Sequence, residues 1–181
     1  AAASMGAAVS IDTRRAGTME AALQAGAGIV NDVSALRYDP RSAEFVAKTG
    51  CPVVLMHAPG KGTDLHEGGT YESVVFDVFD RLRERRDAAI AAGVERGKIL
   101  IDPGLGFGKS LADNLALINA LPLFHALGCP ILFGASRKRM IGALSKEAAA
   151  DARLGGSIAM AIKAMDAGAQ LLRVHDVPET V

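Results

Sequence analysis

One arrangement recurs along this 181-residue chain: a glycine, a short apolar run, and then a polar side chain. Glycine just past a helix is a common left-handed helix end, because it tolerates positive φ. Apolar runs without polar alternation predict strands that are buried on both faces. The pattern therefore predicts alternating strands and helices, and hence a parallel sheet with right-handed crossovers. Glycines of this kind are Gly26, Gly50, Gly93, Gly128 and Gly168.

The expected strands lie near residues 7–11, 28–31, 52–56, 98–101, 130–133 and 169–174. Between them, three segments carry apolar residues at helical spacing, which predicts one buried stripe on each helix. Ser110 followed by Asp113 predicts a capped helix start, and the charge-rich segment 80–87 predicts a solvated helix face. The expected stripes are Val75, Val78, Phe79 and Leu82, then Leu111, Leu115 and Ile118, then Leu154, Ile158, Ile162 and Met165.

A polar side chain follows every expected strand, and this favours a barrel. In an open doubly wound sheet, ligands gather at the one crevice where the strand order reverses. In a (β/α)8 TIM barrel, all carboxyl ends of the strands surround one mouth. Such a barrel has about 250 residues, so we expect residues 1–181 to form a single domain with about six of eight βα units, incomplete at both ends. The polar residues are Asp12, Asn31, Asp32, His57, Asp102, Ser136, Arg137, Lys138, Arg173 and His175.

Charge and cysteine usage narrow the function classes. Lys+Arg and Asp+Glu are balanced at 20 each, and the absence of a basic surplus argues against a nucleic-acid partner. Cys51 and Cys129 each precede an apolar run, so we expect buried thiols, no disulfide framework and a reducing compartment. No apolar run is long enough to span a membrane, and the Ala-rich residues 1–8 lack the basic flank of a signal peptide. These features predict a cytoplasmic protein.

Residues 102–109 form the most informative stretch and read Asp-Pro-Gly-Leu-Gly-Phe-Gly-Lys. Alternating glycines let the backbone approach a ligand closely. Asp102 ends a buried strand, where a carboxylate is costly unless a partner is present. The spacing is not that of a phosphate-binding Walker loop, and the alternative interpretation is a tight turn capped by Asp102.

Cations follow the last two strands. Residues 134–139 read Gly-Ala-Ser-Arg-Lys-Arg and could bind an anion, stack on a flat ring or form a solvated turn. Arg173 and His175 lie on one side of their strand by alternation, so together they could bind a phosphate. His57 could be a base or a metal ligand, but no second His or Cys stands at zinc-ligand spacing.

Six motifs taken together resemble the dihydropteroate synthase family. In chain order they are Ser-Ile-Asp-Thr, Asn-Asp-Val, Leu-Met-His, Asp-Pro-Gly-x-Gly-Phe-Gly-Lys, Gly-x-Ser-Arg-Lys and Arg-Val-His-Asp-Val. The resemblance runs from about Val9 to Val181. It implies a transferase of folate biosynthesis, the target of sulfonamides. That enzyme joins 6-hydroxymethyl-7,8-dihydropterin pyrophosphate to p-aminobenzoate and releases pyrophosphate.

The resemblance also implies roles for individual residues. The residues that bind the pterin in that family correspond to Asp12, Asn31, Met56, Asp102, Gly134 and Lys138. The pyrophosphate-binding set corresponds to Asn31, Arg173 and His175, and the p-aminobenzoate side to Phe107, Ser136 and Lys138. Mg²⁺ is the implied cofactor, and a homodimer is the implied assembly.

The sequence departs from the family in its metal site. The family's Asn-x-Thr-x-Asp-Ser-Phe pattern, whose Asn binds the metal, is absent here, so we expect no metal ligand within this chain. Two alternatives remain. One is a pterin-binding methyltransferase that acts on a corrinoid protein, against which the phosphate-binding motifs argue. The other is a pterin-binding module without catalysis.

Overall fold

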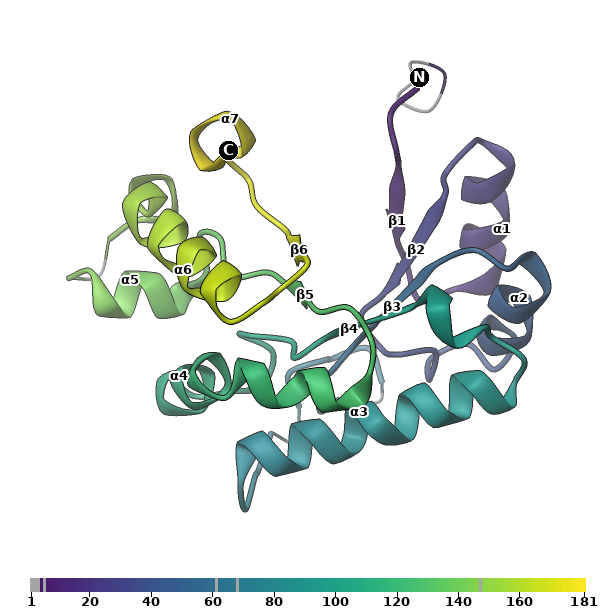
Figure 1. The fold of residues 1–181 in the computed structure, drawn as a ribbon, viewed down its shortest axis with the longest axis horizontal. Helices are drawn as coiled ribbons and strands as arrows, with labels where there is room; N and C mark the ends of the chain where they lie inside the picture. Colours follow the sequence, from purple (N-terminus) through teal and green to yellow (C-terminus); the bar gives the residue numbers. More distant parts are fainter. Residues whose placement is uncertain (1–3, 5, 61, 68, 147) are drawn as a thin grey trace.

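The computed structural model describes residues 4, 6–60, 62–67, 69–146 and 148–181, so part of the Ala-rich start lies outside the described residues. Strands and helices alternate, as expected (Figure 1). The strands are β1 (Ser10–Asp12), β2 (Ile29–Asp32), β3 (Val53–Met56), β4 (Ile99–Asp102), β5 (Leu132–Phe133) and β6 (Leu171–Leu172). The helices are α1 (Ala16–Gln24), α2 (Ser42–Thr49), α3 (Val74–Ala91), α4 (Leu111–Asn119), α5 (Arg139–Leu144), α6 (Leu154–Asp166) and α7 (Val177–Thr180).

Every described strand pairs in parallel with its neighbour in the sequence. β1 to β4 form one sheet in that order, and β5 pairs with β6. A single bridge between Ile101 and Ile131 connects the two sheets. The order never reverses, which is the arrangement of a β/α barrel and not of a doubly wound sheet. Figure 1 shows α1 to α6 on the outer side of a curved array, with β1 and β6 at its two ends.

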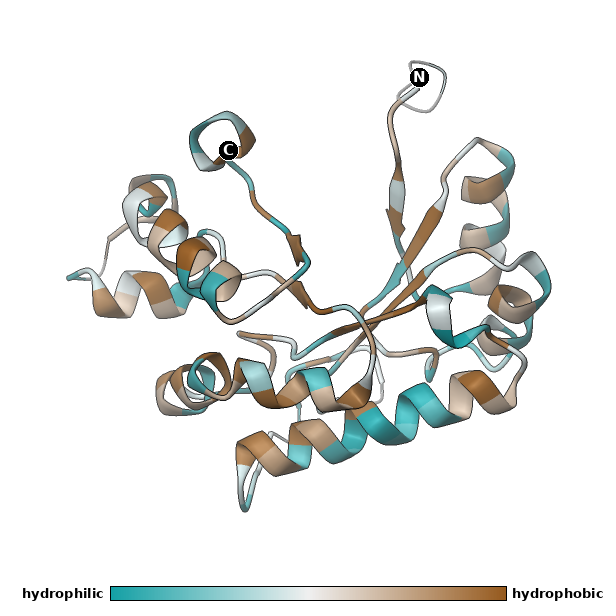
Figure 2. Cartoon of the chain, viewed as in Figure 1, coloured by the Kyte–Doolittle hydropathy of each residue, from teal (hydrophilic) through white to brown (hydrophobic). Residues whose placement is uncertain are grey.

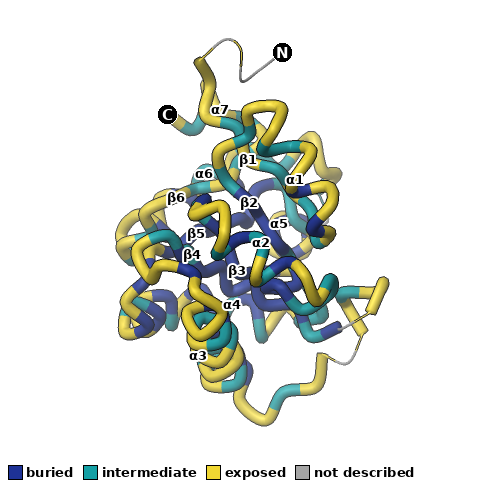
Figure 3. The backbone as a smooth tube through the Cα atoms, turned by 90° about the vertical axis from the view of Figure 1, so that its right-hand side faces the viewer, coloured by how far each residue is buried: buried dark blue, intermediate teal, exposed yellow. Residues whose placement is uncertain are grey.

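Alternation along the strands separates a hydrophobic face from a polar one. Val53, Leu55, Ile99 and Ile101 are fully buried in the core beneath the helices. Hydrophobic residues line β3 and β4 at the centre of Figure 2, and the same strands are buried in Figure 3. The intervening residues point to the opposite face, because successive side chains of a strand alternate. That inner face carries Asp12, Asn31, Met56 and Asp102.

The predicted helix ends are confirmed. The glycines at 26, 50, 93, 128 and 168 all have positive φ, between 65° and 99°. Ser110 and Asp113 form the expected capping box at the start of α4. Strand positions were less accurate: the first strand spans 10–12 and not 7–11, so Asp12 belongs to the strand.

Only one of the three predicted stripes is confirmed in full. In α3, Val78 and Leu82 are buried and Val75 and Phe79 pack against the core. In α4 the stripe is partly wrong, since Leu111 is exposed and the buried residues are Asn114, Leu117 and Ile118.

The predicted stripe of α6 is wrong. Ile162 and Met165 are 54% and 60% exposed, and the face turned inward carries Ser157, Ala161 and Ala164. Small residues let α6 pack closely on its neighbours. This close packing is visible at Gly156, where an added Cβ would overlap Ile141.

The remaining surface and burial expectations agree with the structure. The charge-rich segment 80–87 is a hydrophilic stretch of α3 in Figure 2, mostly exposed apart from Leu82. Cys51 and Cys129 are buried, free thiols. Within the described ranges, no helix combines the length and apolarity that a membrane span requires.

Candidate functional site

Asp12, Asn31 and Arg173 come together at the ends of β1, β2 and β6. The side-chain amide of Asn31 donates to Oδ2 of Asp12 at 3.1 Å. The guanidinium of Arg173 lies 3.5 Å from the same oxygen. The first and last described strands therefore meet through their side chains, and Arg173 remains largely exposed, with 61% of its side chain accessible. The Oδ1 atom of Asn31 is buried and has no partner among the described residues.

Asp102 is a buried carboxylate on the inner face, only 7% exposed. It lies opposite Met56 in the β3–β4 register, and its Oδ1 accepts a hydrogen bond from the Gly104 N–H at 2.7 Å. Burial raises the pKa of Asp102, and the positive charge of Lys138 partly opposes that shift. The positive charge of Arg173 also opposes the rise in the pKa of Asp102. A buried acceptor near two cations suits the polar edge of a heterocycle that carries N–H groups.

The glycine-rich loop 103–109 lies directly against the end of β3. Gly104 has a φ of +69°, and a Cβ there would overlap the carbonyl oxygen of His57. Lys109 fastens the loop: its ammonium group donates to the carbonyls of Gly104 at 2.8 Å and Phe107 at 3.0 Å, and lies 3.0 Å from Nδ1 of His57. Burial lowers the pKa of Lys109 to about 7. The loop is thus held by its own lysine as well as by backbone geometry.

Phe107 and Lys138 line a cleft of about 650 Å³ beside this loop. The ammonium of Lys138 lies 5.2 Å from the centre of the Phe107 ring and donates to the Leu105 carbonyl at 2.5 Å. Burial lowers the pKa of Lys138, and the charge of Asp102 opposes that shift. The Phe107 ring also stacks on His66, with ring centres 5.2 Å apart. An aromatic wall beside a cation fits a flat, anionic ligand.

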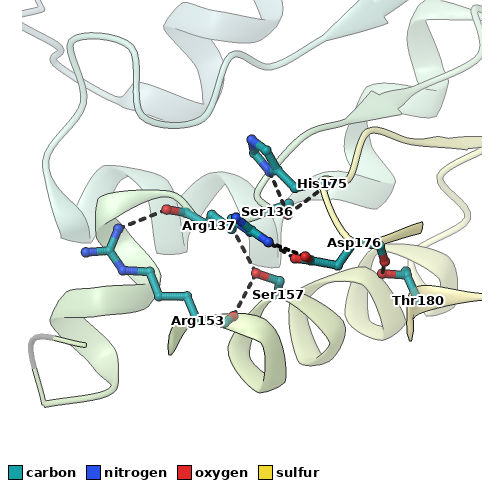
Figure 4. Close-up of polar contacts among 7 residues, drawn as sticks. All are labelled: Ser136, Arg137, Arg153, Ser157, His175, Asp176 and Thr180. Atoms are coloured by element: carbon teal, nitrogen blue, oxygen red, sulfur yellow. Dashed lines mark hydrogen bonds and ion pairs between the residues drawn. The ribbon is translucent and has the colours of Figure 1, made fainter. Parts of the chain in front are cut away.

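Ser136 and His175 form a second polar group, linked to each other (Figure 4). Oγ of Ser136 lies 3.0 Å from Nδ1 of His175 and accepts from its backbone N–H at 3.2 Å. Ser136 does not line the cleft of Phe107 and Lys138. Gly134 faces Arg173, since a Cβ added at Gly134 would lie 3.7 Å from the Cβ of Arg173. The structure therefore joins the β5 and β6 ends through side chains.

Arg137 forms an internal ion pair with Asp176 and also borders the cleft of Phe107 and Lys138. Its guanidinium binds both carboxylate oxygens of Asp176, and its backbone N–H donates to Oγ of Ser157 at 3.0 Å (Figure 4). Arg153 donates to the Arg137 carbonyl at 2.9 Å. The arginine thus ties the β5–α5 loop to the segment after β6. Contact of Arg137 with an anionic ligand, one of the roles that the sequence allows, stays a prediction.

His57 and Asp32 also face away from the inner side of the sheet. Burial, reinforced by the charge of Lys109, lowers the pKa of His57 to about 2, so the ring is neutral. Asp32 is fully buried and accepts from the backbone N–H and hydroxyl of Ser34 at 2.7 and 2.6 Å. Burial raises its pKa. Neither residue reaches the face that carries Asp102, so the suggested base or metal-ligand role of His57 has no support.

Several supporting residues escaped the sequence analysis. Asn114 accepts from the Gly106 N–H at 2.7 Å and donates to the Lys109 carbonyl at 3.2 Å, which fixes the glycine-rich loop on α4. Ser157 and Arg153 support the loop after β5. The available signal was the position of Asn114, three residues after Leu111 and four before Ile118, which places it on the same helix face as the apolar stripe. Among the described residues, no group of three or more His, Cys, Asp or Glu side chains could hold a metal ion.

A sequential parallel β/α array with polar residues at every strand end is typical of a barrel enzyme that binds a small heterocyclic ligand at one mouth. The family model of pterin binding enzymes matches residues 1–175. The chain belongs to this pterin-binding family.

Dihydropteroate synthases are close relatives in sequence and structure. The enzyme of Mycobacterium leprae is 46% identical over 99% of this chain and 65% of its own length. The Xanthomonas albilineans dihydropteroate synthase with 4-aminobenzoic acid has a TM-score of 0.92 and 46% identity, covering 99% of this chain and 63% of that one. The same enzyme in complex with 7,8-dihydropteroate gives a TM-score of 0.89 at 46% identity, covering 96% and 63%. The chain thus spans less than two thirds of these relatives.

Proposed function

We propose that this chain carries the substrate-binding strands of a dihydropteroate synthase. The reaction joins 6-hydroxymethyl-7,8-dihydropterin pyrophosphate to p-aminobenzoate, giving 7,8-dihydropteroate and pyrophosphate. The observation that carries the proposal is the buried carboxylate of Asp102 on the inner face, within reach of the charges of Lys138 and Arg173. The related structures that hold 4-aminobenzoic acid and 7,8-dihydropteroate support it.

In this proposal, the pterin lies on the inner face against Asp102. The carboxylate accepts hydrogen bonds from the amino and N–H edge of the ring, and it stabilises positive charge that develops on the pterin as pyrophosphate leaves. Asp12, Asn31 and Lys138 supply the other polar contacts. Met56 and Gly134 line the pocket; Met56 lies opposite Asp102, and Gly134 leaves room beside Arg173.

Arg173 and His175, with Asn31, are proposed to bind the pyrophosphate. Arg173 is exposed and offers a planar fork of N–H donors, which matches phosphate oxygens. His175 is also exposed, and its ring is oriented by Ser136. Both groups would stabilise the departing anion, so they would contribute most in the transition state.

The p-aminobenzoate is proposed to enter beside Phe107 and Lys138, with Ser136 nearby. Its amine is already a nucleophile and attacks the methylene carbon of the pterin, while the bond from that carbon to the pyrophosphate oxygen breaks. Orientation therefore matters more than a strong base. The aromatic ring of Phe107 and the stem of Lys138 would provide that orientation.

Mg²⁺ is the proposed cofactor of the complete enzyme, where it would neutralise charge on the pyrophosphate. The described residues do not fit a metal site of their own, because they contain no cluster of three His, Cys, Asp or Glu side chains. No step of this mechanism is therefore assigned to a metal ligand of this chain.

We further propose that residues 1–181 belong to a single pterin-binding domain that acts as a homodimer in the cytoplasm. The exposed apolar side chains of Ile162 and Met165 on α6 support a dimer surface. Two free, buried cysteines fit a reducing compartment.

Asp102→Asn is the direct test. The variant should bind a dihydropterin about 10- to 100-fold more weakly, because a charged acceptor is lost. Isothermal titration calorimetry measures the affinity, and Asp166→Asn, an exposed change of the same chemistry, is the control. Unchanged affinity in Asp102→Asn would refute the assignment.

Arg173→Ala tests the anion role separately. It should weaken binding of the pyrophosphate-bearing pterin more than binding of the free pterin. Equal losses for the two ligands would contradict a pyrophosphate contact.

A further inference from the structure

A second cavity, of about 320 Å³, lies on the helix side of the sheet. It is bounded by the end of β3, the segment that follows β2, and the middle of α3. Its charged lining consists of Arg37, Arg81, Arg85 and Glu84. The rest of the wall is formed by Ala35, Met56, His57, Ala58 and Leu82. Arg81 and Arg85 are four residues apart and so share one face of α3. The lining therefore contains three guanidinium groups and only one carboxylate, so its net charge is positive.

Two of the three arginines are held in place by backbone carbonyls. Nε of Arg37 donates to the Ser34 carbonyl at 3.0 Å, and its Nη2 donates to the Ala58 carbonyl at 2.7 Å. Nε of Arg85 donates to the Ala35 carbonyl at 3.1 Å. These bonds use some of the N–H donors and leave others, including Nη1 of Arg37, for a ligand. Fixed side chains lose little conformational entropy when an anion binds.

The arginines of this cavity form no direct ion pair with described residues, although the carboxylates of Glu84 and Asp32 partly oppose their repulsion at Arg37. Within the described part of the chain, none of its arginines lies within 4.0 Å of a carboxylate oxygen, whereas Arg83 on the same helix pairs with Asp80 at 3.0 Å. Burial lowers the pKa of Arg37, and repulsion from Arg85 and Arg81 lowers it further. The charges of Arg81 and Arg37 also contribute to the low pKa of His57. The positive potential thus extends to the imidazole ring of His57, which itself lines the cavity.

We propose that this cavity binds a small phosphate-bearing anion through Arg37, Arg81 and Arg85. Guanidinium groups that approach from two segments suit the several oxygens of a phosphate, whereas a single fork satisfies a planar carboxylate. An anion here would relieve the repulsion among the three arginines. Met56 borders both this cavity and the inner face, but neither Asp102 nor Arg173 lines the cavity, so an anion here would be bound by other charges than the proposed substrate.

The test is calorimetric titration of the chain with inorganic phosphate and with pyrophosphate at constant ionic strength. Titrations are repeated in an Arg173→Ala background, so that binding at the proposed substrate site is removed. Arg81 is the residue to change, because it is exposed and makes no hydrogen bond or ion pair to described residues, so Arg81→Ala should fold. Its matched control is Arg83→Ala, which removes the same charge two residues away.

Arg81→Ala should weaken phosphate binding about 5- to 10-fold, as expected for one charge-assisted contact, and Arg83→Ala should change it less than about twofold. NMR signals of the His57 ring should shift on addition of phosphate while those of His125 stay constant; the chain has only 4 histidines to assign. The two affinities are then compared. Tighter binding of phosphate would indicate a ligand with a single phosphate group, and tighter binding of pyrophosphate would indicate a diphosphate. Equal losses in the two variants, or no shift at His57, would overturn the proposal. Loss of all binding in Arg173→Ala would also overturn it, because the anion would then occupy the substrate site.

Discussion

The two ends of the strand array are built differently. β2, β3 and β4 pair over three or four residues each, and their helix-facing side chains Val30, Val53 and Ile101 are fully buried. β5 and β6 pair over two residues, and Leu171 is 37% exposed. A single bridge connects them to β4.

Side-chain hydrogen bonds supplement the short backbone ladder in the β5–β6 region. Gln170 accepts from the Ile131 N–H at 2.7 Å, Ser136 is linked to His175, and Arg137 is paired with Asp176. The β1–β4 region therefore positions Asp102 through packing and backbone pairing. The β5–β6 region positions Ser136 and Arg173 through polar contacts, which are individually weaker.

The largest contrast should appear in global stability. Ile101→Ala removes a fully buried side chain and should lower the free energy of unfolding by about 2–5 kcal/mol. Leu172→Ala, in the half-buried β6, should cost about 1 kcal/mol. Urea denaturation followed by circular dichroism measures both. Similar losses would show that the two regions share one core of equal density.

A second prediction concerns the acid sensitivity of the β1–β4 region. An unfolded histidine binds a proton near pH 6.5, whereas folded His57 has a pKa of about 2. The contribution of this group to stability is therefore fully present above about pH 6.5 and decreases as the pH falls toward 2. The decrease is about 1.4 kcal/mol per pH unit, or about 2 kcal/mol between pH 6.5 and 5.

His57→Gln should remove this part of the acid sensitivity, since glutamine does not titrate. Denaturant midpoints between pH 7.5 and 5 give the two profiles. Parallel profiles for the wild type and the variant would contradict a neutral, buried His57.

Third, Lys109→Met should loosen the glycine-rich loop without unfolding the sheet. Three acceptors lose their donor, and each buried acceptor left without a partner costs about 1–3 kcal/mol. We expect amide hydrogen exchange in residues 103–109 to increase by about tenfold or more. Lys163→Met, an exposed change on α6, is the control. Unchanged exchange in the loop would show that backbone geometry alone holds it.

The smallest effect should come from the Arg137–Asp176 pair in the β5–β6 region. Arg137 holds the pKa of Asp176 below its usual range. The stabilisation that the ion pair gives the folded state is therefore present above the ordinary carboxyl pKa of about 4. It is lost as the pH falls through the lowered pKa of Asp176. Asp176→Asn should weaken pyrophosphate-bearing ligands only a few-fold and leave the unfolding midpoint nearly unchanged. A large drop in that midpoint would contradict the prediction, because it would show that the pair contributes strongly to global stability.

The sequence predicted the structure best at positions where a single physical requirement selects the residue type, such as positive φ or a helix cap. Gly50 and Gly128 end their helices at positive φ, and Ser110 with Asp113 caps α4, as predicted. Strand-end polarity predicted the inner face that carries Asp12, Asn31 and Asp102. It did not separate His57 and Asp32 from that set, because one step along a strand reverses the direction of a side chain.

Contacts between distant segments could not be read from local patterns. The inward face of α6 is lined by Ser157 and Ala161, because close helix packing selects small residues over the larger Ile162. The partner of Arg137 is Asp176, 39 positions away. The assignment of pterin, pyrophosphate and p-aminobenzoate contacts to individual residues stays a prediction until the binding experiments are done.

Gly104 has an evolutionary consequence. A Cβ at this position would overlap the carbonyl oxygen of His57, so no other amino acid fits, and the positive φ disfavours a replacement even if the space opened. A lineage under selection for altered ligand affinity can therefore vary the neighbours of the loop but not this position. Gly106 also has a positive φ, of 81°, which disfavours a replacement, but an added Cβ there would meet only the flexible stem of Lys138. We therefore expect glycine alone at 104, and at 106 only residues that tolerate positive φ, such as asparagine.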